Sequence, residues 1–288
     1  MRRRALLLVV GLTGDVGAGK STLSNIWADE GAHVVNADAV VAELWKTEEL
    51  ISLAASRWGG EILSEDGTPD HAAISRIIFA DEIEYRWLCD VIHPKVREIM
   101  AEKVRCLDGW VVAEIPLLFE NGVPEWVDLT VYVHAAMDLR LSRNSARGWG
   151  PEEIEKRERW LFEGVKKQNM ADFVLANNGS PGMLECEARN LACGFLAASS
   201  IIRISINAFS VDEARNFRDT VYESGLVPEV RISDTGSLVT AFARQDSIER
   251  VSALIGRIHA GEGLQISVSK CVSVPKHILL WAMEGTES

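Results

Sequence analysis

The sequence predicts an α/β domain with a doubly wound parallel sheet, followed by a ferredoxin-like α+β domain. Two observations predict the first domain. Residues 14–21 match the phosphate-loop pattern G-x-x-x-x-G-K-[ST], and short apolar runs alternate with helical segments as far as residue 198. The second domain is predicted by the order β-α-β-β-α-β, with a further helix, after residue 200. We therefore expect two domains, residues 1–198 and 201–288.

The phosphate loop stands between an expected strand at Ala5–Val10 and an expected helix at Ser21–Glu30. In this context the loop's backbone N–H groups and the positive end of the helix dipole meet phosphate oxygens, and glycines let the backbone approach closely. Lys20 would reach the β- and γ-phosphates, and Ser21 would offer its hydroxyl to Mg²⁺. A chance match in an ordinary glycine turn is the alternative, but both flanking elements disfavour it. The pattern predicts binding of a nucleoside triphosphate.

A carboxylate follows the second expected strand, His33–Asn36. The carboxyl ends of neighbouring strands meet at one crevice in doubly wound sheets, so Asp38 would face the γ-phosphate. There it could accept a hydroxyl proton while the phosphoryl group moves in line. Alternatively, Asp38 is only the N-cap of a helix that starts at Ala39. The residues alone leave both roles open.

The remaining elements of the first domain follow from apolar runs and helix signals. Glu114 ends the third strand, where a carboxylate often stands near a metal through water, although an acid at a strand end is often only solvated. The expected strands are Trp110–Glu114, Leu129–Val133 and Phe173–Ala176, and the expected helices are Ala39–Arg57, His71–Arg105 with a start signal at Pro94, Met137–Arg147 and Met183–Ala198.

Residues Leu12–Thr22, together with Asn36–Asp38, resemble dephospho-CoA kinase, the last enzyme of coenzyme A synthesis. The resemblance covers about residues 5–198. It implies five parallel strands with the phosphate-loop strand at the centre, and a helical insertion that carries the dephospho-CoA site. Five further segments agree in order and spacing: Asp66–Thr68, Ile77–Phe79, His93–Pro94, Ile115–Glu120 and Ala171–Gly179.

The resemblance implies that the γ-phosphate of ATP passes to the ribose 3′-hydroxyl of dephospho-CoA. Asp38 would be the base, and Lys20, Arg147 and Mg²⁺ at Ser21 would stabilise the transferring group. The implied nucleotide contacts are Gly14, Val16, Gly17, Ala18, Gly19, Lys20, Ser21, Thr22, Arg143, Asn177 and Gly179, and the implied acceptor contacts are Asp38, His93, Pro116 and Leu117.

Some of these roles have plainer alternatives. His93 is also explained as a helix N-terminal residue beside Pro94, and Asn177–Gly179, implied to lie near adenine, is also explained as a turn. For the chain as a whole, the alternatives are a kinase for another nucleotide-like acceptor and a non-catalytic, ATP-gated regulatory protein.

A lid is expected at Gly148–Lys167, a glycine-hinged charged segment like that of small-molecule kinases. The preceding helix carries Arg140, Arg143 and Arg147 on one face, which on an ordinary surface helix would be a solvated stripe. Three positions depart from the family's usual residues: Asn36 replaces Asp, Ile77 replaces Arg and Leu161 replaces Gln. These changes predict slower turnover or altered lid closure without loss of chemistry.

Composition agrees with a cytoplasmic enzyme. The net charge of −12 argues against a nucleic-acid partner, because a phosphate backbone needs a basic face. The five cysteines have no C-x-x-C spacing, which indicates reduced thiols. Arg2–Arg4 and the apolar run after it imitate a signal peptide, but the run leads directly into the glycine loop. No stretch approaches transmembrane length, so no membrane partner is expected.

The region after Ser200 weakly resembles the CutA divalent-ion tolerance family. The family's second-strand cysteine is absent, since Pro228 and Glu229 stand there, and its long hairpin is cut to a short turn. His259 is better explained as a residue at a helix end, and Glu262 as a residue in a loop, than either is as a metal ligand. We expect an assembly or regulatory module without catalysis that forms a homo-oligomer, for which the family's trimer is the model. The matching pieces are Val211–Ala214, Ile258–His259, Glu262 and Trp281–Thr286.

Overall fold

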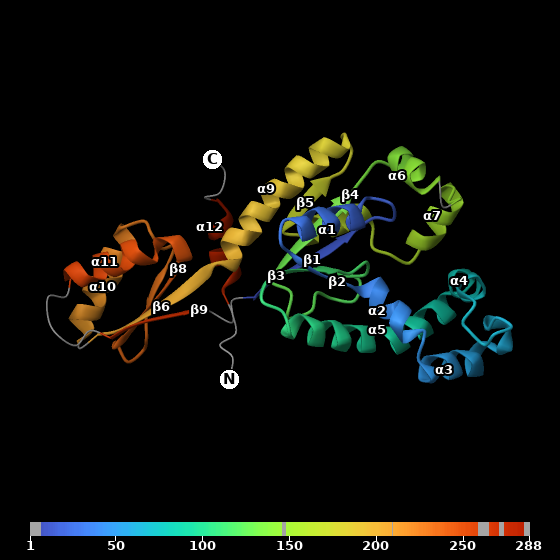
Figure 1. The fold of residues 1–288 in the computed structure, drawn as a ribbon, viewed down its shortest axis with the longest axis horizontal. Helices are drawn as coiled ribbons and strands as arrows, with labels where there is room; N and C mark the ends of the chain where they lie inside the picture. The colour runs from blue at the N-terminus through green and yellow to red at the C-terminus, as the bar shows by residue number, and fades with distance from the viewer. Residues whose placement is uncertain (1–6, 146–147, 209, 259–264, 271–273, 285–288) are drawn as a thin grey trace. The chain divides into compact units, whose positions relative to one another are not determined.

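The computed structural model describes residues 7–145, 148–208, 210–258, 265–270 and 274–284 of the 288-residue chain. The chain divides into two compact units. The first comprises residues 9–107 and 111–185. The second comprises the chain from Cys186 onward, together with residues 108–110 and a short segment at the N-terminus of the chain. Figure 1 shows the chain. Among the described residues, no helix is both long and apolar enough to span a membrane.

The predicted five-stranded parallel sheet is confirmed, with the phosphate-loop strand at its centre. The strand order is β2-β3-β1-β4-β5. β1 runs further than the sequence predicts and ends at the first glycine of the loop. Because a parallel sheet is covered on both faces, its central strands are almost wholly buried. The strands are β1 (Leu7–Gly14), β2 (His33–Asn36), β3 (Gly109–Glu114), β4 (Leu129–His134) and β5 (Phe173–Ala176).

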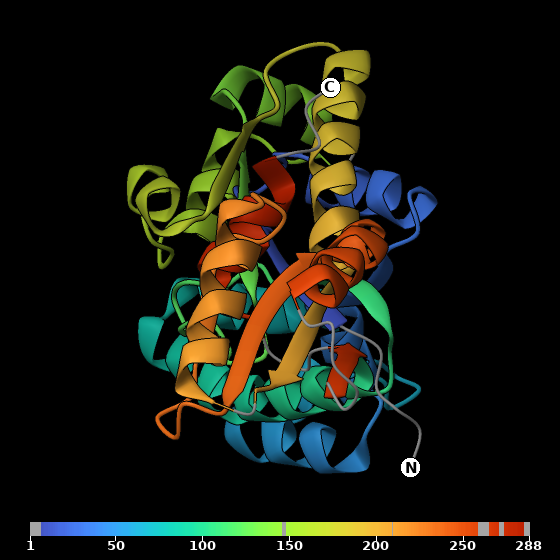
Figure 2. The ribbon, with the colours of Figure 1, turned by 90° about the vertical axis from the view of Figure 1, so that its left-hand side faces the viewer.

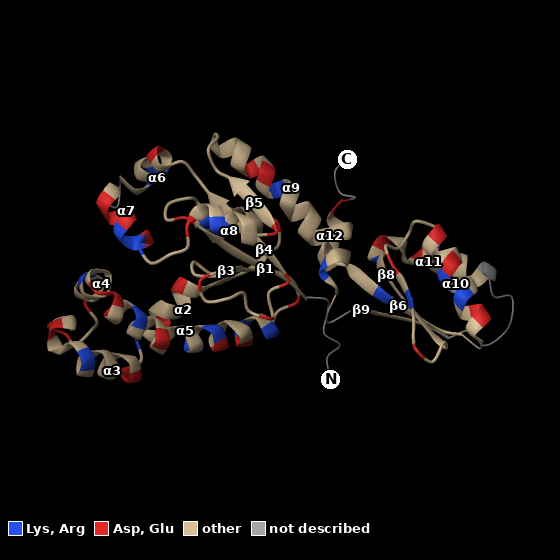
Figure 3. Cartoon of the chain, turned by 180° about the vertical axis from the view of Figure 1, so that it is seen from behind, with Lys and Arg blue, Asp and Glu red and all other residues tan. Residues whose placement is uncertain are grey.

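Helices α3, α4 and the start of α5 form a group at one end of this unit (Figure 1). Figure 3 shows acidic and basic residues mixed along α3 and α5, as on solvated helices. The helices from α1 to α9 are α1 (Lys20–Asp29), α2 (Ala37–Leu44), α3 (Glu48–Trp58), α4 (His71–Ala80), α5 (Glu82–Arg105), α6 (Met137–Asn144), α7 (Pro151–Glu158), α8 (Gly164–Met170) and α9 (Pro181–Ser199), with a 3₁₀ turn at Gly60–Ile62.

One expected helix is wrong in its boundaries, and one stretch expected to be largely helical is confirmed as two helices. The helix expected at Ala39–Arg57 is two helices, because Thr47 caps α3 by accepting a hydrogen bond from the N–H of Leu50. The stretch expected at His71–Arg105 breaks at Asp81, which caps α5 by accepting from Ile83 N at 2.8 Å. Pro94 lies inside α5 rather than at a helix start. The alternative placement of His93 as a helix N-terminal residue is therefore wrong.

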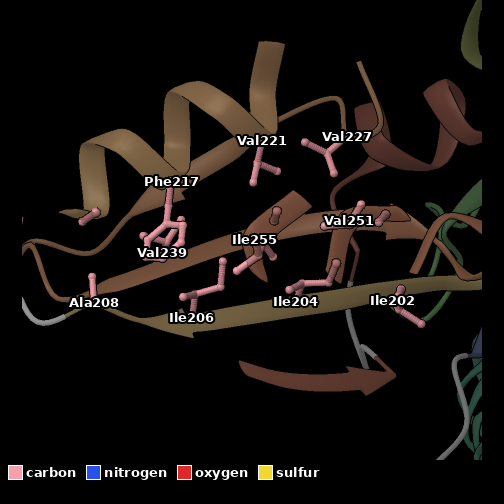
Figure 4. Close-up of a cluster of buried hydrophobic side chains, with 13 residues drawn as sticks. Ile202, Ile204, Ile206, Ala208, Phe217, Val221, Val227, Val239, Val251 and Ile255 are labelled. Atoms are coloured by element: carbon pink, nitrogen blue, oxygen red, sulfur yellow. The ribbon is translucent and has the colours of Figure 1, made fainter. Parts of the chain in front are cut away.

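The second unit contains the predicted ferredoxin-like arrangement. Its antiparallel sheet has the order β7-β8-β6-β9, and Figure 2 shows α10 and α11 on one face of it. Alternate residues of β6 (Ile202, Ile204 and Ile206) pack against Phe217 of α10 and Val251 of α11 (Figure 4). The elements are β6 (Ile201–Asn207), α10 (Val211–Glu223), β7 (Val230–Ile232), β8 (Leu238–Arg244), a 3₁₀ turn at Gln245–Ser247, α11 (Ile248–Ile258), β9 (Gln265–Lys270) and α12 (Lys276–Glu284).

Candidate active site

The phosphate loop has a backbone that only glycines suit. Gly17 and Gly19 have φ angles of +77° and +105°, in the left-handed region that other residues rarely adopt. A Cβ at Gly17 would lie 2.0 Å from Asn144 Nδ2, and one at Gly19 would lie 2.5 Å from Asn177 Nδ2. Gly19 is also the N-cap of α1, so the N–H groups of the loop lie next to the positive N-terminal end of that helix.

Lys20 directs its ammonium group back over the loop. Its Nζ donates to the carbonyl oxygens of Gly14 at 3.0 Å and Asp15 at 3.1 Å. Burial lowers the pKa of Lys20, while the nearby carboxylates of Glu114 and Asp38 act in the opposite direction. A buried cation with carboxylates nearby is thus held at the mouth of the loop.

Ser21 and Glu114 meet at the edge of the loop. Ser21 Oγ donates to Glu114 Oε1 at 3.2 Å, and Ser24 Oγ donates to Glu114 Oε2 at 3.1 Å. The Glu114 side chain lies within the protein, with only 3% of the residue exposed. A hydroxyl and a buried carboxylate beside a phosphate site form an all-oxygen donor set, which suits Mg²⁺. Among the described residues, no group of three or more His, Cys, Asp or Glu side chains is arranged to hold a metal ion.

Asp38 lies in the first turn of α2, and the N-cap of that helix is Asn36. The side chain of Asn36 accepts a hydrogen bond from Ala39 N at 3.0 Å. The alternative role of Asp38 as N-cap is therefore wrong. Burial raises the pKa of Asp38, and the ammonium of Lys20 partly offsets this. Asn caps a helix as well as Asp does, so the departure at residue 36 keeps the cap.

Two adjoining cavities share Asp38. The larger, of about 570 Å³, is lined by the phosphate loop, Lys20 and Glu114, and by residues such as Trp149 and Arg157 from the segment expected to be a lid. The smaller, of about 120 Å³, is mostly apolar. All four predicted acceptor contacts line the smaller cavity, namely Asp38, His93, Pro116 and Leu117. Asp38, Pro116 and Leu117 also line the larger one. Burial lowers the pKa of His93, so its imidazole is neutral near pH 7.

The other predicted nucleotide contacts are divided. Val16, Thr22 and Arg143 line the larger cavity with the loop glycines 17 and 19. Arg143 donates to Asn177 O at 2.9 Å, and the Asn177 side chain donates to Ala18 O at 2.8 Å. Asn177 thus contacts the backbone of the loop at Ala18 and lines neither cavity. Gly14, Ala18 and Gly179 do not line them either, and Arg147 lies outside the described residues.

Asn144 carried no sequence signal of a role, whereas Arg157 matches a family position in the expected lid and Arg140 was predicted only as part of a helix face. Asn144 lines the larger cavity and donates to Arg140 O at 2.8 Å. Arg157 lies over the Trp149 ring at 4.0 Å and over the Phe79 ring at 5.2 Å. Arg140 is buried rather than part of a solvated stripe. A pattern of spacing identifies a helix face, but not which distant element covers it.

The sequence profile of the dephospho-CoA kinase family matches residues 8–182. The chain belongs to the dephospho-CoA kinase family. The predicted enzyme class, an ATP-dependent phosphotransferase, is confirmed. A dephospho-CoA kinase from Shewanella oneidensis is 32% identical over 194 residues, covering 66% of this chain and 95% of that protein. Another, from Geobacillus kaustophilus, is 36% identical over 181 residues, covering 61% and 90%.

A solved structure from Thermus thermophilus agrees with the fold of the kinase. It is 32% identical, covers 66% of this chain and 96% of its own, and superposes with a TM-score of 0.55. The profile match ends at residue 182 and assigns no family to the region from about 200 to 288. The CutA resemblance of that region stays a prediction, and its residues His259 and Glu262 lie outside the part of the chain that the structure describes.

Proposed function

We propose that the kinase transfers the γ-phosphoryl group of ATP to the ribose 3′-hydroxyl of dephospho-CoA, with Asp38 as the general base. One observation carries the proposal: Asp38 lines both the cavity of the phosphate loop and the adjoining apolar pocket. A carboxylate at that junction can take the acceptor's proton while the hydroxyl oxygen attacks in line. Its raised pKa makes it a stronger base than an exposed aspartate.

The charges around the loop would stabilise the transferring group. Lys20 would leave its loop carbonyls for the β- and γ-phosphate oxygens, and Arg143 would add a second cation from α6. Arg147, outside the described residues, is proposed to clamp the phosphates by resemblance alone. These cations would neutralise charge on the γ-phosphoryl oxygens as it develops, which is the main task of a protein in phosphoryl transfer.

Ser21 and Glu114 would hold Mg²⁺, Glu114 through water. The ion, when bound, would neutralise phosphate charge and keep the β- and γ-phosphates aligned. The buried Glu114 carboxylate supports this assignment, because two hydroxyl donors only partly compensate a buried charge.

The smaller pocket would receive the acceptor. Its lining is mostly apolar and includes Met100, Trp126 and Leu118, which suits an uncharged part of the acceptor. His93 and Arg97 supply polar groups at its wall. Pro116 and Leu117 would position the acceptor between this pocket and Asp38.

Coenzyme A formation from ATP and dephospho-CoA tests the proposal directly. We expect Mg²⁺-dependent coenzyme A formation by the full chain and none by Lys20→Ala, which removes a cation from the transition state. Product formation with another nucleotide-like acceptor, and not with dephospho-CoA, would favour the alternative kinase. ATP binding without transfer to either acceptor would favour a regulatory protein.

We further propose that the second unit is a divergent CutA-like module that assembles the kinase into a homo-oligomer. Its strands β7 and β9 are the edges of a four-stranded sheet, and exposed edges tend to pair or to be shielded. On β9, Ile266 and Val268 remain 36% and 44% exposed. They pair with Ile206 and Ile204, so they lie on the core face of the sheet. An apolar edge of this kind favours a second copy as its partner.

The proposal includes a cytoplasmic location. Free thiols suit a reducing compartment, and the cysteines that the structure describes are free. These are Cys89, Cys106, Cys186 and Cys193.

A further inference from the structure

The backbone of Val16 in the phosphate loop is held at both its N–H group and its carbonyl group by side chains from α6 and α7. The N–H of Val16 donates to Glu158 Oε1 at 3.0 Å. The carbonyl oxygen of Val16 accepts from Arg140 Nε at 2.8 Å. Arg140 Nη2 also donates to the same oxygen of Glu158, so the three residues form a closed ring of hydrogen bonds.

The ring is anchored in the protein interior. Arg140 is only 6% exposed, and its Nη1 lies 3.8 Å from Asp15 Oδ2. Asp15 Oδ1 in turn accepts from the hydroxyl of Tyr132 at 2.6 Å. Burial, with this hydrogen bond, raises the pKa of Tyr132, so the phenol stays protonated and remains a donor. Glu158 is the member of the ring that comes from the lid, because it is the last residue of α7.

The position of the ring gives it a consequence for nucleotide binding. Gly17, the residue after Val16, lines the larger cavity and lies against Asn144 of α6. Rotation of the peptide that joins Val16 to Gly17 would change the backbone at Gly17, and a glycine adopts other backbone angles easily. A fixed backbone at Val16 therefore keeps the loop in the shape that receives phosphates.

We propose that Glu158 is a positioning residue for ATP: it ties helix α7 to the phosphate loop and, with Arg140, fixes the backbone on both sides of Val16. The Arg140 guanidinium balances the negative charge of Glu158 near the phosphate site. Glu158 therefore acts through the hydrogen bond that it accepts from Val16 N–H. Figure 3 shows that α7 carries both acidic and basic residues. Glu155, an exposed neighbour on that helix, provides the comparison.

The test rests on the kinase activity and compares KM values for ATP and for dephospho-CoA in the full chain. Glu158→Ala should raise KM for ATP about tenfold, the size expected for a lost charge-assisted hydrogen bond, and leave KM for dephospho-CoA near the wild-type value. Glu158→Gln keeps an acceptor oxygen but not the charge, so it should raise KM for ATP less than Glu158→Ala does. Glu158→Asp keeps the charge but is too short to reach Val16 N, so it should resemble Glu158→Ala. Glu155→Ala should change neither constant.

Three outcomes would overturn the proposal. An unchanged KM for ATP in Glu158→Ala would mean that the ring does not shape the loop. An equal rise in both KM values would indicate a general loss of structure. A normal Glu158→Asp beside an impaired Glu158→Gln would assign the effect to charge rather than to the hydrogen bond. If Glu158→Ala does not fold, the Gln and Asp variants still decide between these results.

Discussion

The hydroxyl of Ser21 donates a hydrogen bond of 3.2 Å to Oε1 of Glu114. Ser21 belongs to the first turn of α1, and Glu114 is the last residue of β3, which adjoins β1 in the sheet. The strand order thus brings a carboxylate to the start of the helix that follows the phosphate loop. Ser24, one turn along α1, supports the other carboxylate oxygen at 3.1 Å.

Glu114→Gln should raise the Mg²⁺ concentration needed for half-maximal activity by roughly 10–100-fold, because it removes the charge next to the proposed metal site and keeps the shape. Coenzyme A formation measured against Mg²⁺ concentration checks this. Ser24→Ala is the matched control, since it removes a donor from the same carboxylate but leaves its charge. An unchanged Mg²⁺ dependence in Glu114→Gln would remove Glu114 from the metal site.

Asp38→Asn should lower turnover by roughly 10²–10⁴-fold with little change in ATP affinity, the range expected for a general base. The thermal midpoint should not fall, because Asn36 supplies the cap of α2. The base acts when deprotonated, so activity should fall as pH falls through its pKa. Burial raises that pKa, so this acidic limb should lie above the pH at which an exposed aspartate titrates. Intact turnover with a lowered midpoint would give Asp38 a structural role only.

The loop and its flanking elements could be predicted because their chemistry is local. A glycine pattern, an apolar run before it and a helix after it are contiguous in sequence. The cap at Thr47 was also local, since Thr47 precedes Glu48 and Glu49 at the start of α3, yet the apolar pattern across it suggested one long helix. The cap interrupts the helical run because Thr47 itself has an extended backbone, with φ −82° and ψ 134°.

The contact between Val16 and Glu158 could not be predicted. The two residues are 142 positions apart, and nothing near Glu158 distinguishes it from the other acidic residues of α7. Arg143 illustrates the same limit. Its spacing on α6 predicted a face, but its hydrogen bonds to Asn177 depend on how β5 ends beside the loop. Tertiary packing decides such pairs.

Asp128→Asn should stabilise the first unit at neutral pH. Burial raises the pKa of Asp128 to about 6, although the N–H of Val9 donates to its carboxylate at 2.8 Å. With a folded-state pKa above the unfolded value, the native contribution of Asp128 is greatest at low pH and is lost as pH rises through about 6. Asn keeps an acceptor for Val9 and has no charge to bury.

The free energy of unfolding, measured by urea titration between pH 4 and pH 8, checks this. We expect Asp128→Asn to exceed wild type by about 1–2 kcal/mol at pH 8, after allowance for partial exposure, and the difference to shrink toward pH 4. Glu125→Gln, at an exposed position in the same loop, controls for the loss of a surface charge. A difference that does not vary with pH would contradict the assignment of the raised pKa to Asp128.

Removal of the chain after Ser199 should leave a folded, active kinase of smaller oligomeric size. Every residue with a proposed catalytic role precedes position 180, and β6 to α11 bury a hydrophobic core of their own. The truncation keeps α9 whole, including Phe195, which packs on Trp110 of β3 with ring centroids 5.5 Å apart. It removes α12, whose Met283 lies against Gly194 of α9, so a modest fall in thermal midpoint is expected.

Light scattering and coenzyme A formation on the full and truncated chains decide the role of the second unit. If the apolar edge β9 pairs with a second copy, the full chain should be the larger species, and the charged substitution Val268→Lys on that edge should reduce it to the size of the truncated protein. Arg231→Lys on β7 keeps its charge and should leave the size unchanged. Equal oligomeric size in both chains would refute assembly through this unit. Loss of activity in a folded truncated protein would instead mean that the second unit completes the active site, because no residue of the proposed catalytic set has been removed.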